Sequence, residues 1–374
     1  TGTHPATQVL SSAIYAGSSS EAFWNGVSVL SGNAGTNADI DVIGGLISGS
    51  EMTGNIQEII LYSSDQDAAG NRAGIETNIN TFYDIYTEPV APLLLNNYPG
   101  AAAAYSLRRI NSSYQGSAVL VQTALNTKGP VYIGFDSNND LDTTSLAAYG
   151  GSEDVVVAGW LDQSGNGNDA SQATSANRPK IYDGTTGVVL ENGKPALDVD
   201  GANDSLVAGS VSLNSYCSWF YVAKPDATGG FIFEHSADSN PGNGGYNYLG
   251  IDNAAEIYRN PLTASQNATA GAGYAGTSQT LIDWNYSGSW TAYKDGSTLA
   301  INAGLGNNGD VGNSSATDEL NLFSRNESSF FFNGKFQEII FYNTDQDNAG
   351  NRTSIEENIG GYYDIPLPGL LDEN

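Results

Sequence analysis

The chain has 374 residues, and its 41 acidic against 13 basic side chains give a formal net charge of −28. A field of this sign repels nucleic acids and anionic membrane surfaces, so it argues against both as partners. Only 14% of the residues are charged, whereas glycine alone occupies 45 positions. Such a composition is typical of many short strands joined by turns, so the sequence predicts an all-β protein.

One stretch of sequence occurs twice, at 55–85 and at 335–365. Each copy begins with an apolar run suited to a strand, passes through a polar turn and enters a helix with isoleucines four residues apart. Gly360 and Gly361 are expected to end the second helix. The runs 8–15 and 22–30 also align with 279–286 and 291–299, so the first 86 residues match only the back half of a later domain.

Glutamate is kept at the same place in both copies of the repeat, as Glu58 and Glu338. Repetition inside a closing unit favours a structural role over catalysis, such as bonding a neighbouring backbone group. Cys217 is the single cysteine, so no disulfide can form within the chain. No run of about 18 apolar residues occurs, which is the length that a membrane-spanning helix needs.

Two segments resemble known families. The motifs at 155–172, 178–181 and 192–201, together with the closing unit at 334–365, resemble a laminin-G or concanavalin-A-like domain. That resemblance implies an antiparallel two-sheet jelly-roll sandwich. The motifs at 104–121, 133–136, 141–146 and 160–165 resemble the catalytic-domain family of α-L-arabinofuranosidase B, and similar segments resemble those of bacteriophage tail and virion proteins.

Two departures weaken the enzymatic implication. Fungal members of the arabinofuranosidase B family are cysteine-rich and have adjacent cysteines in the sugar site, whereas this chain has only Cys217. Their nucleophile and acid residues match no motif here, so no catalytic residue is assigned.

Three prolines, Pro89, Pro92 and Pro99, mark a linker, because each removes a backbone donor and disfavours helix before it. The predicted organisation has five parts: the C-terminal half of a laminin-G-like jelly roll at 1–88, the linker at 89–100, a β-rich connector at 101–150, a complete jelly roll at 151–366, and a tail at 367–374.

A glycan site is predicted near the end of the apolar run 231–233. Glu234 and His235 form an adjacent acid and base there, although a strand running into a solvated loop explains them as well. Aromatic side chains in glycine- and asparagine-rich surroundings offer flat faces to sugar rings. The predicted glycan contacts are Glu234, His235, Tyr246, Asn247, Tyr248 and Tyr258.

Oxygen-bearing side chains at alternate positions form a candidate calcium loop, namely Asp136, Asn138, Asp140 and Asp142. Leu141 stands where an EF-hand needs glycine, and Ala147 where it needs glutamate, so this is not an EF-hand. A hairpin turn rich in Asn and Asp is the alternative explanation. Calcium is the one cofactor that the sequence brings into consideration.

The resemblances and the composition together favour a non-catalytic extracellular or virion surface protein with a structural or adhesive role. Its expected partners are other copies of itself, other virion or surface proteins, and a cell-surface glycan bound through jelly-roll loops. A homo-oligomer is expected, with a trimer if the protein is a fibre or decoration protein. The alternative is a glycoside hydrolase of α-L-arabinofuranosidase type acting on arabinose-containing polysaccharide. The half-sandwich at 1–88 is expected to be completed by upstream residues, a neighbouring chain or the 101–150 segment.

Overall fold

The computed structural model describes residues 8–14, 17–33, 55–66, 72–83, 85, 93–213, 217–227, 229–236, 245–249, 256–260, 266–270, 278–303 and 319–368. The chain divides into two compact units, Thr1–Ala91 with Gly369–Asn374, and Pro92–Pro368. The side chains of Tyr246, Asn247, Tyr248 and Tyr258, four of the predicted glycan contacts, lie outside what is described, although their strands do not. Most of the predicted tail also lies outside the described residues.

The smaller unit is a three-stranded antiparallel sheet with one helix. Its strands are β1 (Ser11–Ile14), β2 (Ser20–Trp24) and β3 (Val27–Gly32), paired in that order, with a short 3₁₀ turn η1 (Gly17–Ser19) before β2. The helix α1 (Arg72–Tyr83) bonds to the sheet through the Ser12 hydroxyl, which donates to the Glu76 carboxylate. Residues 55–62, one of the two repeated apolar runs, form no strand here.

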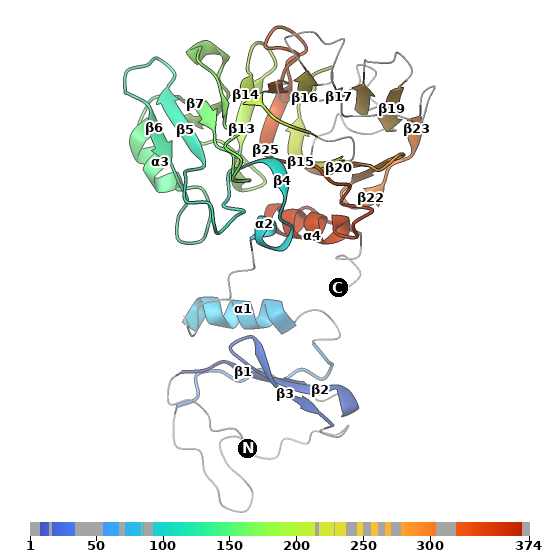
Figure 1. Cartoon of the computed structure of the whole chain (residues 1–374). Coiled ribbons are helices and arrows are strands. Elements are labelled where there is room, and N and C mark those ends of the chain that lie inside the picture. The colour runs from blue at the N-terminus through green and yellow to red at the C-terminus, as the bar shows by residue number, and fades with distance from the viewer. Residues whose placement is uncertain are drawn as a thin grey trace, which may run out of the picture. The chain divides into compact units, whose positions relative to one another are not determined.

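The larger unit is built from strands, as the composition predicted (Figure 1). Its strands are β4 (Ala101–Ser106), β5 (Val119–Thr123), β6 (Val131–Ile133), β7 (Val155–Trp160), β8 (Ala170–Ser171), β9 (Lys180–Asp183), β10 (Gly187–Val188), β11 (Leu190–Glu191), β12 (Lys194–Pro195), β13 (Leu197–Asp200), β14 (Leu206–Ser210), β15 (Cys217–Pro225), β16 (Phe231–Ser236), β17 (Gly245–Leu249), β18 (Glu256–Asn260), β19 (Gln266–Ala270), β20 (Thr280–Tyr286), β21 (Trp290–Lys294), β22 (Ser297–Thr298), β23 (Ile301–Ala303), β24 (Glu319–Leu322) and β25 (Asn333–Tyr342). The helices are α2 (Leu94–Asn97), α3 (Thr143–Gly150) and α4 (Arg352–Tyr363), and η2 (Ser175–Asn177) is a 3₁₀ turn.

Two antiparallel sheets face each other across the core of the larger unit. In one sheet β25 pairs with β4 on one side and β15 on the other, and β15 continues to β20 and β21. In the other, β14, β24, β16, β17, β18 and β19 follow one another. Trp219 of β15 meets Phe233 of β16 edge to face, with ring centroids 5.2 Å apart. The all-β two-sheet sandwich predicted from the sequence is therefore confirmed.

The second repeated unit closes this sandwich. Its strand is β25 and its helix is α4, whose Ile355 and Ile359 pack against Phe220 and Ile340 on the outer side of the sheet. The predicted end of the helix at Gly360 and Gly361 is wrong, because α4 continues to Tyr363. A Cβ at Gly360 would lie 2.8 Å from the Leu367 side chain, so glycine is needed there for close packing.

The segment 101–150 contributes β4, β5, β6 and α3 to the larger unit. Strand β4 bonds along β25, and β5 bonds along β7, so the two edges of the segment join different parts of the sandwich. Within the described part of the chain, no helix has the length and apolar character needed to cross a membrane.

Candidate functional site

A row of polar residues crosses the sheet that contains β16. The backbone register places Glu234 of β16 opposite Asn321 of β24 on one side and Tyr246 of β17 on the other. The row continues from Tyr246 to Arg259 of β18 and from there to Asn267 of β19. Residues directly opposite one another in an antiparallel sheet share a face. The register therefore lines up Glu234 and Asn321 with positions 246, 259 and 267 of the neighbouring strands.

The core lies against the other face of the same sheet. Phe233 and His235 flank Glu234 along β16, so they belong to the face opposite the polar row. Phe233 meets both Trp219 and Phe341 in the core. Glu234 therefore lies on the side of the sheet away from that core, where its side chain and that of Asn321 are also buried.

Glu234 and His235 do not end in a solvated loop. Their side chains are 0% and 2% exposed, and the His235 Nε2 donates to the carbonyl oxygen of Val211 at 2.6 Å. Because Nε2 is the donor, its bond fixes the orientation of the imidazole. The two residues lie on opposite faces of β16, so they do not form an acid and base pair on one surface.

The register pairs Tyr246 of β17 with Glu234, and Asn247 of β17 with Tyr258 of β18. These predicted glycan residues therefore occupy three neighbouring strands of one sheet. Sequence reasoning missed Asn321, since only strand pairing places it beside Glu234.

The predicted calcium residues are Asp136, Asn138, Asp140 and Asp142. Asp136 accepts backbone N–H bonds from two residues of its own turn, at 2.8 and 3.0 Å. Asp140 accepts the Tyr362 hydroxyl at 2.6 Å. Asp142 caps α3 by accepting from Ser145 N at 2.9 Å, and bonds from the Ser145 hydroxyl and N–H lower the pKa of Asp142. Among the described residues, no group of three or more His, Cys, Asp or Glu side chains could hold a metal ion.

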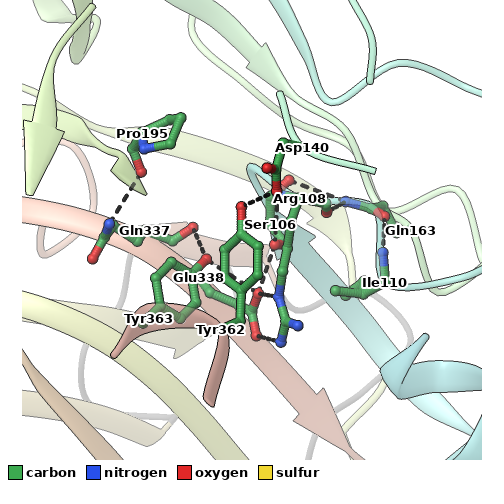
Figure 2. A network of polar contacts seen from close by, with 10 residues as sticks. All are labelled: Ser106, Arg108, Ile110, Asp140, Gln163, Pro195, Gln337, Glu338, Tyr362 and Tyr363. Carbon is green, nitrogen blue, oxygen red and sulfur yellow. Dashed lines mark hydrogen bonds and ion pairs between the residues drawn. The ribbon is translucent and has the colours of Figure 1, made fainter. Parts of the chain in front are cut away.

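A buried ionic network joins the 101–110 segment to the closing unit (Figure 2). Glu338 accepts the Arg108 Nε at 2.9 Å and its Nη2 at 3.1 Å, and also the Ser106 hydroxyl at 2.6 Å. Tyr363 adds a fourth bond to the carboxylate at 3.2 Å. Burial alone would lower the pKa of Arg108, but the Glu338 carboxylate raises it above its ordinary value. Glu338 is thus a structural anchor, and its main partner is a side chain rather than the backbone group expected.

The same segment is also bonded to the turn after β7. Gln163 accepts from Ile110 N at 2.9 Å and donates to the carbonyl oxygens of Ser106 and Arg108. Asp162 accepts the Ala104 N–H at 2.8 Å. These bonds satisfy backbone groups of residues 104–110 that do not pair with β25. Buried backbone groups need such partners. The segment resembling an arabinofuranosidase catalytic domain is therefore fixed on both sides.

A second buried pair consists of two acids. Asp283 on β20 and Glu356 on α4 are 0% and 2% exposed. Burial raises the pKa of Asp283 well above its ordinary value, and the hydrogen bond with Glu356 and the charge of Glu356 raise it further. Burial also raises the pKa of Glu356, against the lowering effects of its bond to Asp283 and of Arg352. Both shifts favour one shared proton over two buried charges.

The comparisons with known proteins were made by sequence and by structure. No family model matches the chain, and no curated protein matches it. A solved arabinofuranosidase complexed with arabinofuranosyl-α-1,2-xylobiose resembles it with a TM-score of 0.49 and 16% identity over 69% of this chain and 62% of the other. A GH54 α-L-arabinofuranosidase soaked with a cyclic sulfate inhibitor gives 0.47 and 15% over the same shares.

A more distant likeness is to the CBM40 domain of a Ruminococcus gnavus sialidase bound to α2,3 sialyllactose, with a TM-score of 0.30 and 9% identity over 36% of this chain and 78% of the other. The chain spans 62% of the length of the arabinofuranosidases. The structural neighbours are thus β-sandwich proteins related to carbohydrates.

These comparisons correct the functional prediction. The sequence favoured a non-catalytic virion or surface adhesion protein, whereas the structures that resemble the chain include several α-L-arabinofuranosidases. The adhesion prediction is therefore wrong, and the alternative, a glycoside hydrolase, is better supported. The error arose because the lack of paired cysteines was given more weight than the motifs at 104–165.

Proposed function

We propose that the larger unit is a glycoside hydrolase of α-L-arabinofuranosidase type that acts on arabinose-containing polysaccharide. The observation that carries the proposal is the pairing of Glu234 on β16 with Asn321 on β24, set in the same sandwich as the 104–165 motifs. A sugar is bound by carboxyl and amide groups that exchange hydrogen bonds with its hydroxyls. Glu234 and Asn321 supply one group of each kind on neighbouring strands.

Glu234 is the proposed catalytic carboxyl of the row. Glycosidases use two carboxyls that flank the scissile bond, about 5 Å apart when configuration is retained and about 6.5–9.5 Å apart when it is inverted. In the retaining case one of them attacks the sugar and forms a covalent glycosyl-enzyme intermediate, which water then hydrolyses. We place Glu234 in that role, beside Asn321 of the neighbouring strand.

The test is turnover of an aryl α-L-arabinofuranoside and of arabinan by the purified chain, with calcium supplied. We expect Glu234→Gln to lower kcat by about 10²-fold or more, the size of effect typical of a catalytic acid or base. The matched control is Glu319→Gln, an exposed glutamate of the neighbouring strand β24, which should stay within about twofold of wild type.

A nucleophile also predicts chemical rescue. Sodium azide should restore sugar release by Glu234→Ala and yield a glycosyl azide, because the small anion replaces the missing carboxylate. Absence of turnover by the wild type on both substrates would refute the proposal. Binding of arabinan without turnover would instead favour a carbohydrate-binding role for the same row.

The narrower assignments are part of the proposal. We propose a laminin-G-like classification for residues 151–366 and a glycan as the main partner. We also propose an extracellular location, because polysaccharide substrates are found there. Mass spectrometry of culture supernatant and cell fractions from the source tests the location.

A further inference from the structure

Just before Glu234, strand β16 contains a β-bulge. The register pairs Phe231 and Phe233 with neighbouring positions of β17, so Ile232 between them is an extra residue on β16. An extra residue interrupts the alternation of side chains along a strand. The bulge therefore places Phe231 on the face of Glu234 rather than on the face of Phe233.

The packing of these residues agrees with that placement. Ile232 and Phe233 both belong to the hydrophobic core of the sandwich. Phe231 instead stacks on Phe330, with ring centroids 5.5 Å apart and ring planes 22° from parallel. Phe330 precedes β25 and is 42% exposed, so the stack reaches from the sheet to the protein surface. Since Phe231 is on the face of Glu234, the stack lies on that face as well.

The stack is close to the proposed catalytic carboxyl. Glu234 pairs with position 246 of β17, and Phe231 pairs with position 248. Two positions along a strand are about 7 Å apart, so Phe231 and Glu234 are neighbours on their shared face. Asn321 of β24 lies directly opposite Glu234. A sugar chain that binds at Glu234 and continues along β16 therefore meets the stack with a neighbouring unit.

Backbone bonds hold Phe330 in this position. Its carbonyl oxygen accepts the Phe231 N–H at 2.8 Å, and the Phe323 carbonyl oxygen accepts the Phe332 N–H at 2.7 Å across the base of the loop. Phe323 and Phe330 both have positive φ, 70° and 51°. Bulky residues rarely adopt this conformation, which persists only where the surroundings fix it and is typical of binding sites. The exposed ring is thus presented by a preorganised loop.

Hydrogen-bonding groups accompany the exposed ring. The guanidinium carbon of Arg325 lies 5.9 Å from the centre of the Phe330 ring. Glu327, in the same loop, accepts the side-chain amide of Gln172 at 2.8 Å, which ties the loop to the segment after β8. Sugar sites combine a flat aromatic surface, which covers the apolar face of a sugar ring, with donors and acceptors for its hydroxyls. The loop carries both kinds of group.

We propose that Phe330 is the stacking platform of a second sugar subsite, which binds the unit of an arabinose-containing polysaccharide next to the unit that is cleaved. This inference rests on the proposed function, because it takes Glu234 as the catalytic carboxyl. Phe330 covers the apolar face of the second sugar, and the Arg325 guanidinium donates to its hydroxyls. The platform therefore favours substrates with a second sugar and takes no part in breaking the bond.

Two substrates separate this subsite from the cleavage site. Methyl α-L-arabinofuranoside offers one sugar, whereas a linear arabinan oligosaccharide extends to the next. Phe330→Ala should lower kcat/KM for the oligosaccharide by about five- to tenfold, mainly by raising KM. The value for the methyl glycoside should stay within about twofold of wild type.

Two further variants distinguish stacking from simple apolar cover. Phe330→Trp keeps a flat ring and should retain the preference for the oligosaccharide. Phe330→Leu keeps apolar cover over Phe231 without a flat ring and should lose the preference. The matched control is Tyr132→Ala, which removes an aromatic side chain that is 62% exposed on β6 of the same unit. It should leave both substrates within about twofold of wild type.

The failures of the platform and of the hydrolase are distinguishable. Turnover combined with equal effects of Phe330→Ala and Tyr132→Ala, with an equal loss on both substrates, or with a preference that survives in Phe330→Leu would overturn the platform alone. Absence of turnover by the wild type would refute the hydrolase, and electrophoresis through gels containing arabinan would then test the platform. Arabinan should retard the wild type and Tyr132→Ala more than Phe330→Ala, and equal mobilities would overturn the subsite.

Discussion

Replacing Glu338 by Gln tests the view that this glutamate is a structural anchor. The substitution keeps the shape of the side chain and removes its charge. It leaves the Arg108 guanidinium, which is 7% exposed, without its ionic partner inside the protein. Glutamine can still accept hydrogen bonds through its oxygen, but in either orientation its amide nitrogen would face a guanidinium donor of Arg108.

The expected cost follows from the burial of the pair. Breaking a buried ion pair by removing one partner costs about 3–5 kcal/mol, because the other charge remains buried and uncompensated. In a domain of this size, one kcal/mol shifts Tm by about 2–4 °C, so Glu338→Gln should lower Tm by roughly 6–20 °C. The repeat supplies a matched control, since Glu58 occupies the same place in the smaller unit and is exposed.

The assay is urea unfolding of both variants followed by tryptophan fluorescence. Tryptophans lie in both units, Trp24 in the smaller and Trp160, Trp219, Trp284 and Trp290 in the larger, so the signal reports on the unfolding of both. Glu58→Gln should change the free energy of unfolding by less than about 0.5 kcal/mol, as surface substitutions usually do. Equal effects of the two substitutions, or a loss below about 1 kcal/mol for Glu338→Gln, would refute the reasoning.

Three further predictions follow from buried or capping groups. Because the folded state raises the pKa of Asp283, folded protein holds more protons than unfolded protein above about pH 4, and its stability falls as pH rises. Asp283→Asn should reduce that slope by up to about 1.4 kcal/mol per pH unit, measured by urea unfolding between pH 5 and 8, and parallel curves would contradict it. Cys217 should react with a thiol reagent only after unfolding, because it is buried and its pKa is raised, so fast labelling of native protein would count against the structure. Asp142→Ala should cost about 1 kcal/mol by removing the cap of α3, in thermal unfolding with Asp136→Ala for comparison.

The sequence was sufficient for the fold class and for the repeat. Local patterns carry both, because alternating apolar residues and glycine-rich turns report strands directly, and a copied unit is visible without any structure. The structural role of Glu338 could also be inferred, because the residue recurs as Glu58 in the second copy of a unit that closes the fold. Its partner, Arg108, lies 230 positions away, and no local pattern connects the two.

The polar row shows why the site itself was only partly predictable. Glu234, Tyr246 and Tyr248 were found as individual residues, but the row depends on the pairing of β24 with β16, which lie far apart in sequence. That pairing adds Asn321, whereas the opposite faces of Glu234 and His235 follow from alternation along β16 itself. The sequence did contain one indication of the role of Arg108. The chain has only 13 basic residues, and a basic residue inside an apolar run needs a buried acidic partner.

The acid pair at Asp283 and Glu356 changes how the charge of this protein should be counted. The smaller unit has Ser12 where the larger has Asp283, and there a hydroxyl supplies the proton that binds the glutamate. In the larger unit solvent must supply it. Burial also raises the pKa of Asp204 to about 7, so Asp204 and the pair both favour the uptake of protons on folding near neutral pH. Folding of this protein is therefore a proton-binding reaction, and its calorimetric enthalpy will depend on the ionisation heat of the buffer.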